Sequence, residues 1–124
     1  MKTSSAKNKG RILQKLLASK LSKLYNIEEG NFVSRPMGSP GLDLIVSPQV
    51  KEFSGLNRHF GFECKNQESC NLRKEYEVHS AKHPETFNVL IHKKNHKKEL
   101  AVMSLDDFLY LLGLIHGKGQ TSAN

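Results

Sequence analysis

The sequence predicts an α/β domain in which helices flank a mixed five-stranded β-sheet, in the order α-β-β-β-α-β-β-α. Apolar residues recur every three or four positions in residues 7–25, which is typical of an amphipathic helix. Five short runs rich in β-branched and aromatic residues follow, with two helical segments among them. The chain has 124 residues and a mass of 14.0 kDa, the size of a single domain. We therefore expect one domain, with flexible tails at residues 1–8 and 117–124.

The composition is basic and moderately polar. The formal net charge is +7 and the pI is near 9.5, which favours an anionic partner such as nucleic acid. No apolar run approaches the length of about 20 residues that a membrane-spanning helix needs, and the chain does not start with a signal-type segment. We therefore expect a soluble, cytoplasmic protein. Hydrophobic residues make up only 37% of the chain, so a partner subunit is expected to bury some apolar surface.

The predicted N-terminal helix has an apolar stripe and a basic face. The stripe consists of Ile12, Leu13, Leu16, Leu17, Leu21 and Leu24. The opposite face carries Lys9, Arg11, Lys15 and Lys23. These cations either contact phosphate groups or form an ordinary solvated helix face, and the sequence leaves both interpretations open.

Three strands are predicted next, at residues 31–35, 42–47 and 59–65. Residues 36–41 contain two prolines and two glycines, which is typical of a loop, and such a loop can close over a substrate strand. Residues 48–58 are predicted to be a long hairpin connection that projects from the sheet.

The second half of the chain contains two helices and two strands. A helix is predicted at residues 69–82, where Pro84 ends it, and strands at 86–91 and 100–103. The basic turn from Lys93 to Lys98 either contacts DNA or is simply solvated. Ser104 is a typical N-cap for a last helix at residues 105–114. The apolar residues of that helix close the core or form a dimer interface: Phe108, Leu109, Leu111, Leu112 and Leu114.

The third predicted strand has one apolar and one chemically reactive face. Side chains alternate between the faces of a strand, so Glu63 and Lys65 lie on the same face. That face also carries His59 and Gly61, whereas Phe60, Phe62 and Cys64 point the other way. In the preceding strand Asp43 lies among apolar residues, where an unpaired carboxylate is costly. Asp43 therefore requires a partner or a metal ion.

Asp43 followed by Glu63-Cys64-Lys65 resembles the motif of the PD-(D/E)xK nuclease superfamily. The resemblance implies a restriction-endonuclease-like core and a Mg²⁺ ion bound by Asp43, Glu63 and the backbone carbonyl of Cys64, with Mn²⁺ as a substitute. Two carboxylates suit Mg²⁺, which keeps several of its waters. Lys65 would then stabilise the attacked phosphate, or orient or deprotonate the water. Gly61 is expected to leave room for the DNA backbone.

Within that superfamily, the chain is most similar to the archaeal-type Holliday junction resolvases, which include phage relatives. Residues 9–14 match the start of their first helix except that Gln14 replaces a glutamate, and Arg35 with Ser39 matches their loop before the aspartate. The resemblance implies a homodimer that resolves branched DNA, a four-way junction, by paired symmetric nicks. Gln14 keeps an oxygen near the metal but lacks the charge, so the number of metal ions stays open. The expected DNA contacts are Lys9, Arg11, Lys15, Arg35, Ser39, Lys93 and Lys94.

Other interpretations remain open. The chain can be a nicking or restriction-type nuclease of the same superfamily, or a non-catalytic DNA-binding module. An acid pair repels phosphate unless a metal ion is present, which favours a nuclease over the binding module. His79 and His83 are one helical turn apart, but without a third ligand a structural or surface role is favoured. His59 either contacts the phosphate or lies at a solvated strand end, and Cys64 is expected to be a buried apolar residue rather than a nucleophile.

Overall fold

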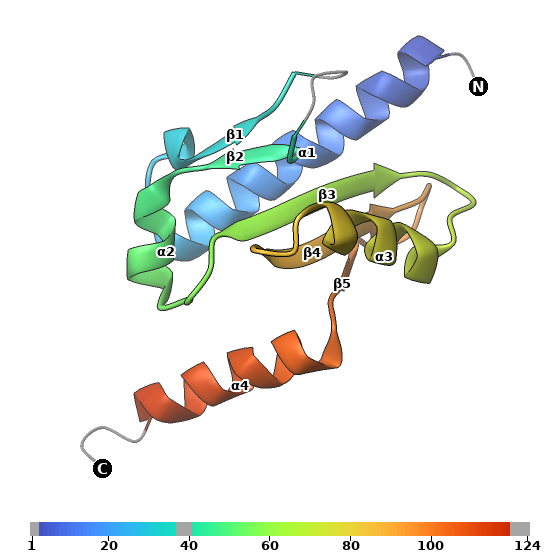
Figure 1. Ribbon diagram of the computed structural model, residues 1–124. Coiled ribbons are helices and arrows are strands. Elements are labelled where there is room, and N and C mark those ends of the chain that lie inside the picture. The colour runs from blue at the N-terminus through green and yellow to red at the C-terminus, as the bar shows by residue number, and fades with distance from the viewer. Residues whose placement is uncertain (1–2, 37–40, 120–124) are drawn as a thin grey trace.

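A computed structural model of the chain describes residues 3–36 and 41–119 (Figure 1). The helices in these ranges are α1 (Thr3–Tyr25), α2 (Pro48–Ser54), α3 (Leu72–Lys82) and α4 (Leu105–Gly119), with a 3₁₀ turn η1 (Glu29–Asn31). The strands are β1 (Phe32–Ser34), β2 (Leu44–Val46), β3 (Phe60–Asn66), β4 (Phe87–Lys93) and β5 (Leu100–Val102). No helix in the described ranges has both the length and the apolar character needed to cross a membrane.

The strands form two small sheets. β1 and β2 pair antiparallel, whereas β4 lies between β3, to which it is parallel, and β5, to which it is antiparallel. The predicted α/β class with a mixed sheet is therefore confirmed, but the single five-stranded sheet is wrong. In the described part of the chain, one backbone hydrogen bond joins the sheets, from the Asp43 N–H to the Phe62 carbonyl at 3.3 Å. β2 has only three residues, and Asp43 precedes it rather than lying within it.

The predicted hairpin connection at residues 48–58 is also wrong, because most of this segment is helix α2. The Ser47 hydroxyl accepts a hydrogen bond from the Gln49 N–H at 3.3 Å, and Pro48 occupies the first turn. Gly55 ends the helix with φ 80°, a left-handed conformation that glycine adopts without strain. Val50 is fully buried, so α2 packs against the core instead of projecting from the sheet.

The terminal helices are longer than predicted. α1 begins at Thr3 rather than at residue 7, so the expected flexible tail is helical over residues 3–8. α4 continues to Gly119 rather than ending at residue 114, so the second expected tail is helical over 117–119. Both errors have one cause, since polar residues that extend a helix into solvent leave no apolar periodicity in the sequence.

The two faces of β3 are covered by different helices, which is what positions the site. Phe62 and Cys64 point into the core together with Leu13 of α1 and Phe87 of β4. α3 covers the opposite face, the one that carries Glu63 and Lys65 (Figure 1). β4 is buried along nearly its whole length because both faces are covered.

α4 is anchored at its N-terminal half and leaves an apolar face open. Arg58 pairs with Asp107 at 3.0 Å, and its guanidinium lies over the rings of Phe87 and Tyr110, 5.0 and 5.6 Å from their centroids. Tyr110 also accepts a hydrogen bond from the Asn57 N–H at 2.8 Å. The exposed apolar residues of this helix, here called the α4 stripe, are Leu105, Phe108, Leu109, Leu112 and Ile115.

Candidate active site

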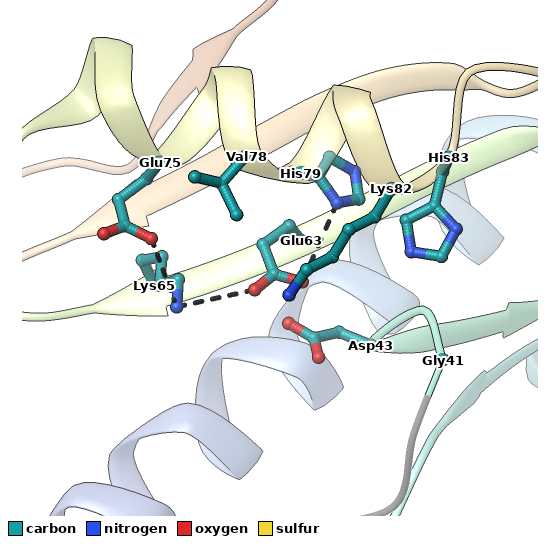
Figure 2. Close-up of a pocket in the computed structure, with 9 residues that line it drawn as sticks. All are labelled: Gly41, Asp43, Glu63, Lys65, Glu75, Val78, His79, Lys82 and His83. Carbon is teal, nitrogen blue, oxygen red and sulfur yellow. Dashed lines mark ion pairs between the residues drawn. The ribbon is translucent and has the colours of Figure 1, made fainter.

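Asp43 and Glu63 lie together at the junction of the two sheets (Figure 2). One carboxylate oxygen of Asp43, Oδ2, accepts a hydrogen bond from the Cys64 N–H at 2.7 Å, next to the Asp43 N–H bond to Phe62. These two bonds fix the carboxylate beside β3 at the level of Glu63. The structure therefore brings together the two acids that the sequence predicts, even though no strand ladder connects them.

The Asp43 carboxylate is partly buried and is repelled by the neighbouring Glu63 carboxylate. The pKa of the Asp43 carboxyl is raised from 3.8 to about 6, chiefly by burial and in smaller part by the neighbouring Glu63 carboxylate, whereas the Cys64 N–H and the Lys65 ammonium act in the opposite direction. The negative form of Asp43 is thus disfavoured at its position. A divalent cation near both oxygens would relieve this repulsion.

Lys65 is held by two carboxylates instead of one. Its Nζ lies 3.5 Å from Glu63 Oε2 and 3.5 Å from Glu75 Oε1 of α3. Burial alone would lower the pKa of Lys65, but the two carboxylates outweigh it and the pKa is raised. Lys65 is therefore a firmly protonated ammonium, which suits stabilisation of negative charge better than deprotonation of water. Sequence reasoning missed Glu75, because only the packing of α3 on β3 brings it to Lys65.

His79 is also part of this site. It is only 4% exposed, and its Nε2 lies 2.8 Å from the Gly61 carbonyl oxygen, to which it must donate. Burial lowers the pKa of His79, so the neutral ring has its proton on Nε2. Nδ1 then faces Glu63 Oε1 at 3.9 Å without a proton of its own. His79 thus lies beside Glu63, a predicted site residue. The sequence did not indicate this neighbourhood.

Two hollows flank the acidic pair. The α3 pocket, of about 480 Å³, lies between β3 and α3 and is lined by Gly41, Asp43, Glu63, Lys65, Glu75, Val78, His79, Lys82 and His83. A smaller hollow of about 210 Å³ lies on the α1 side, where Gly10, Gln14 and Cys64 join Asp43 and Glu63. Both hollows are thus reached by the same two carboxylates.

Gln14 lies in the wall of the α1-side hollow, together with Asp43 and Glu63. Its side chain is 2% exposed, and its Oε1 accepts a hydrogen bond from the Ser34 hydroxyl at 2.5 Å. Gln14 therefore links α1 to β1 while lining the hollow. A neutral amide at this depth adds no third negative charge to the pair of acids.

The donor set fits Mg²⁺ better than a transition metal. In the described ranges, no group of three or more His, Cys, Asp or Glu side chains is arranged to hold a metal ion. Mg²⁺ needs only one or two carboxylates and fills its remaining positions with waters and substrate oxygens. The Cys64 N–H points to Asp43 rather than to β4, and the carbonyl of a strand residue points the same way as its N–H. Asp43, Glu63 and the Cys64 carbonyl would thus be the ligands.

The cysteines and His59 contribute no nucleophile. Burial, reinforced by the Asp43 and Glu63 carboxylates, raises the pKa of the Cys64 thiol, so it stays protonated. Burial likewise raises the pKa of the Cys70 thiol, and this residue does not line either hollow. His59 is exposed just before β3 and does not line the α3 pocket, so it takes no part in the acidic pair.

Gly61 has a different role from the one predicted. A Cβ at this position would lie 2.4 Å from Thr86 Oγ1 and 2.5 Å from Asn88 Oδ1. The space beside Gly61 is therefore filled by the start of β4 and is not open to a DNA backbone. Glycine is required here for close packing of buried polar side chains.

Arg35 braces the loop that leads to Asp43. Its Nε donates to the Leu42 carbonyl at 2.6 Å, its N–H donates to the Asp43 carbonyl at 2.9 Å, and its guanidinium lies against Gly41. Gly41 has φ 112°, which a side chain would make strained. Ser39, the other predicted DNA contact of this loop, lies outside the described residues.

The basic residues of α1 do not share one face, contrary to the prediction. Lys9 and Arg11 are separated by about 200° around the helix axis. Lys9 donates to the Asn95 side chain at 3.2 Å, beside the basic turn, whereas Arg11 donates to Asn8 at 2.7 Å. Lys15 is exposed on the Arg11 side, one turn along.

In the basic turn, the Lys93 ammonium bonds to backbone carbonyls of the turn itself, those of Lys94 at 2.9 Å and Lys97 at 2.7 Å. Lys93 therefore stabilises the turn, and Lys94 is the predicted contact that stays exposed. Asn95 ties the turn to α1 through Lys9, so Lys9 lies beside the basic turn.

Comparison of the chain with family models, with curated proteins and with solved structures gave no match.

Proposed function

We propose that this chain is a Mg²⁺-dependent endodeoxyribonuclease with a restriction-endonuclease-like fold, which resolves four-way DNA junctions by paired symmetric nicks. The observation that carries the proposal is the hydrogen bond from the Cys64 N–H to Asp43, which holds a second carboxylate beside Glu63 and Lys65. Mn²⁺ is the expected substitute for Mg²⁺, since both prefer oxygen ligands.

Each residue of the site has a task in phosphodiester hydrolysis. A phosphodiester is anionic and resists attack, so positive charge must reach the scissile phosphate and a water must be activated in line with it. The bound Mg²⁺ supplies Lewis acidity and an activated water. Asp43 and Glu63 hold the ion, and Lys65, kept protonated by Glu63 and Glu75, stabilises charge on the attacked phosphate. Gln14 links α1 to β1 beside the pair of acids, and His79 donates its Nε2 proton to the Gly61 carbonyl of β3.

The substrate and the assembly follow from charge and exposed surface. The net charge of +7 supports a polyanionic partner that is bound through its phosphate backbone. Two sites are needed to nick two strands symmetrically, so we also propose a homodimer. The α4 stripe supports it, because monomers rarely expose five large apolar side chains along one helix.

The test uses purified protein with end-labelled four-way junction, linear duplex and single strand, each in Mg²⁺ or in EDTA. Paired symmetric nicks in the junction alone, and only with Mg²⁺, are the expected result. Cleavage of linear duplex at a similar rate would indicate a simpler nuclease. Binding of the junction with no cleavage in either Mg²⁺ or Mn²⁺ would indicate a non-catalytic binding module.

Substitutions then locate the chemistry. Asp43→Asn, Glu63→Gln and Lys65→Ala should each lower the cleavage rate by at least about 100-fold, because each removes a charge that the transition state needs. Junction binding in EDTA should persist, and should tighten in the two carboxylate variants, since repulsion of phosphate is removed. Glu77→Gln is the matched control, because Glu77 pairs only with exposed Arg73 on α3 and should leave the rate unchanged. Full activity in Asp43→Asn would overturn the assignment.

A further inference from the structure

The α3 pocket contains a cation that the proposed chemistry does not use. Glu75, Val78, His79 and Lys82 line it at spacings of three and four residues, so they form one face of α3. Lys65, at one end, is already neutralised by Glu63 and Glu75. Lys82, at the last position of the helix, forms no ion pair with any residue that the structure describes.

The Lys82 side chain is directed along the pocket. Figure 2 shows it extending from the end of α3 toward the carboxylates of Glu63 and Asp43, with His83 beside it. An exposed lysine at a helix C-terminus usually interacts only with the helix dipole and with water. Here the side chain lines the α3 pocket together with the Asp43 and Glu63 carboxylates instead.

The volume of the pocket exceeds the needs of a metal ion. The α3 pocket measures about 480 Å³, within the range of ligand pockets of roughly 300–1,000 Å³ and many times the volume of about 30 Å³ that one water occupies. The carboxylates of Asp43, Glu63 and Glu75 line this pocket, and Lys82 and His83 enter it from the C-terminal end of α3. A group that is large and anionic on one side fits this distribution of charge, and a nucleotide unit of a DNA strand has this character.

We propose that Lys82 is a phosphate-binding residue, which holds a backbone phosphate of the DNA strand adjoining the one that is cut. The proposal rests on the nuclease function argued above and deepens it by assigning the path of the strand, along the α3 side of the acidic pair. In this proposal Lys65, which is held by two carboxylates, acts on the attacked phosphate, and Lys82 binds the phosphate of the neighbouring nucleotide. Lys82 is a binding residue, not a catalytic one.

Binding measurements test this without relying on cleavage. All variants are made in the Asp43→Asn background and measured in EDTA, with a five-nucleotide single strand and with the four-way junction over a range of salt. Lys82→Ala should weaken binding of both probes about threefold to tenfold and reduce the slope of log K against log salt by about 0.7–0.9, the loss of one phosphate contact. Lys82→Arg should restore both values, because arginine also binds phosphate.

Lys74→Ala is the matched control, since Lys74 is exposed on α3 but does not line the α3 pocket. Equal affinities and salt slopes for Lys82→Ala and Lys74→Ala would overturn the proposal. Junction cleavage by the protein with unaltered binding in Lys82→Ala would leave the nuclease function intact and remove the Lys82 site. Binding that depends on Lys82, in a protein that cuts no DNA, would support the Lys82 site and remove the nuclease function. A protein that binds neither probe would remove both.

Discussion

Asp43 combines burial with a hydrogen bond that orients it, and this combination has a cost for the folded protein. Its pKa in the folded state is about 6, above the ordinary value of 3.8, chiefly because of burial. The folded chain therefore binds a proton more readily than the unfolded chain between these two values. The stability that this proton contributes is present below about pH 4 and is lost as the pH rises through 6.

Asp43→Asn should accordingly stabilise the protein at neutral pH in the absence of metal. We expect the melting temperature in EDTA to rise by a few degrees at pH 7.5, a gain on the order of 1 kcal/mol after allowance for solvent screening, and to be unchanged at pH 4. Thermal unfolding followed by circular dichroism measures both. Asp106→Asn, at an exposed carboxylate of α4, should show no such gain. A lower melting temperature for Asp43→Asn at pH 7.5 would contradict the claim that the ionised Asp43 carboxylate destabilises the folded protein.

Gly61 offers a second prediction for a single residue. Gly61→Ala should destabilise the protein by about 1–3 kcal/mol, because the new Cβ collides with buried Thr86 and Asn88. Gly113→Ala is the control: nothing lies within 4 Å of a Cβ there, and alanine in a helix should be neutral or stabilising by up to about 1 kcal/mol. Urea unfolding gives both values. If Gly61→Ala is as stable as the parent, the glycine serves an open surface, as the sequence had indicated.

At the scale of elements, Arg58 contributes several of the contacts that hold α4. Arg58→Ala should cost about 1–2 kcal/mol and loosen α4, since it removes the pair with Asp107 and the contacts with the rings of Phe87 and Tyr110. In Arg58→Ala, the increase in amide hydrogen exchange over the parent protein should be larger in residues 105–119 than in the other elements. Arg73→Ala removes an exposed pair on α3 and should cost at most about 0.5 kcal/mol. Similar losses in the two variants would show that the rings add nothing to the anchor.

Local patterns predicted most elements but not their assembly. Alternation and β-branched runs located all five strands, because these signals lie within a few residues. α2 was missed although Ser47, Pro48 and Gly55 mark its ends, since the segment is short and has one buried residue, Val50. The division into two sheets depends on whether β2 pairs with β3, and pairing between strands is a non-local property that such patterns do not show.

The same limit applies to the site. Asp43, Glu63 and Lys65 could be predicted because strand alternation and an acid in apolar surroundings are visible in the sequence. Glu75 and His79 could not, since their place depends on which face of α3 packs on β3. Nor could the sequence show that the Lys93 ammonium bonds to the carbonyls of its own turn.

For the whole molecule, the α4 stripe leads to a prediction about assembly. Phe108→Glu and Leu109→Glu should each convert the proposed dimer to a monomer in light scattering with little change in melting temperature, because both side chains are about half exposed within one chain, at 48% and 52%. Leu24→Glu, at an apolar residue of α1 that is 73% exposed, should leave the mass unchanged. A parent protein that is monomeric at tens of micromolar would refute the dimer.

The division of the strands into two sheets places the halves of the acidic pair on separate structural units. Asp43 belongs to the β1–β2 unit and Glu63 to the β3–β4–β5 unit, and the Asp43 N–H and carboxylate supply the polar contacts described between them. A relative motion of the two units would change the distance between the Asp43 and Glu63 carboxylates. The geometry of the site therefore depends on how closely the two units pack. Hydrogen exchange of the Asp43 and Cys64 amides should therefore slow together when a divalent cation binds to both carboxylates.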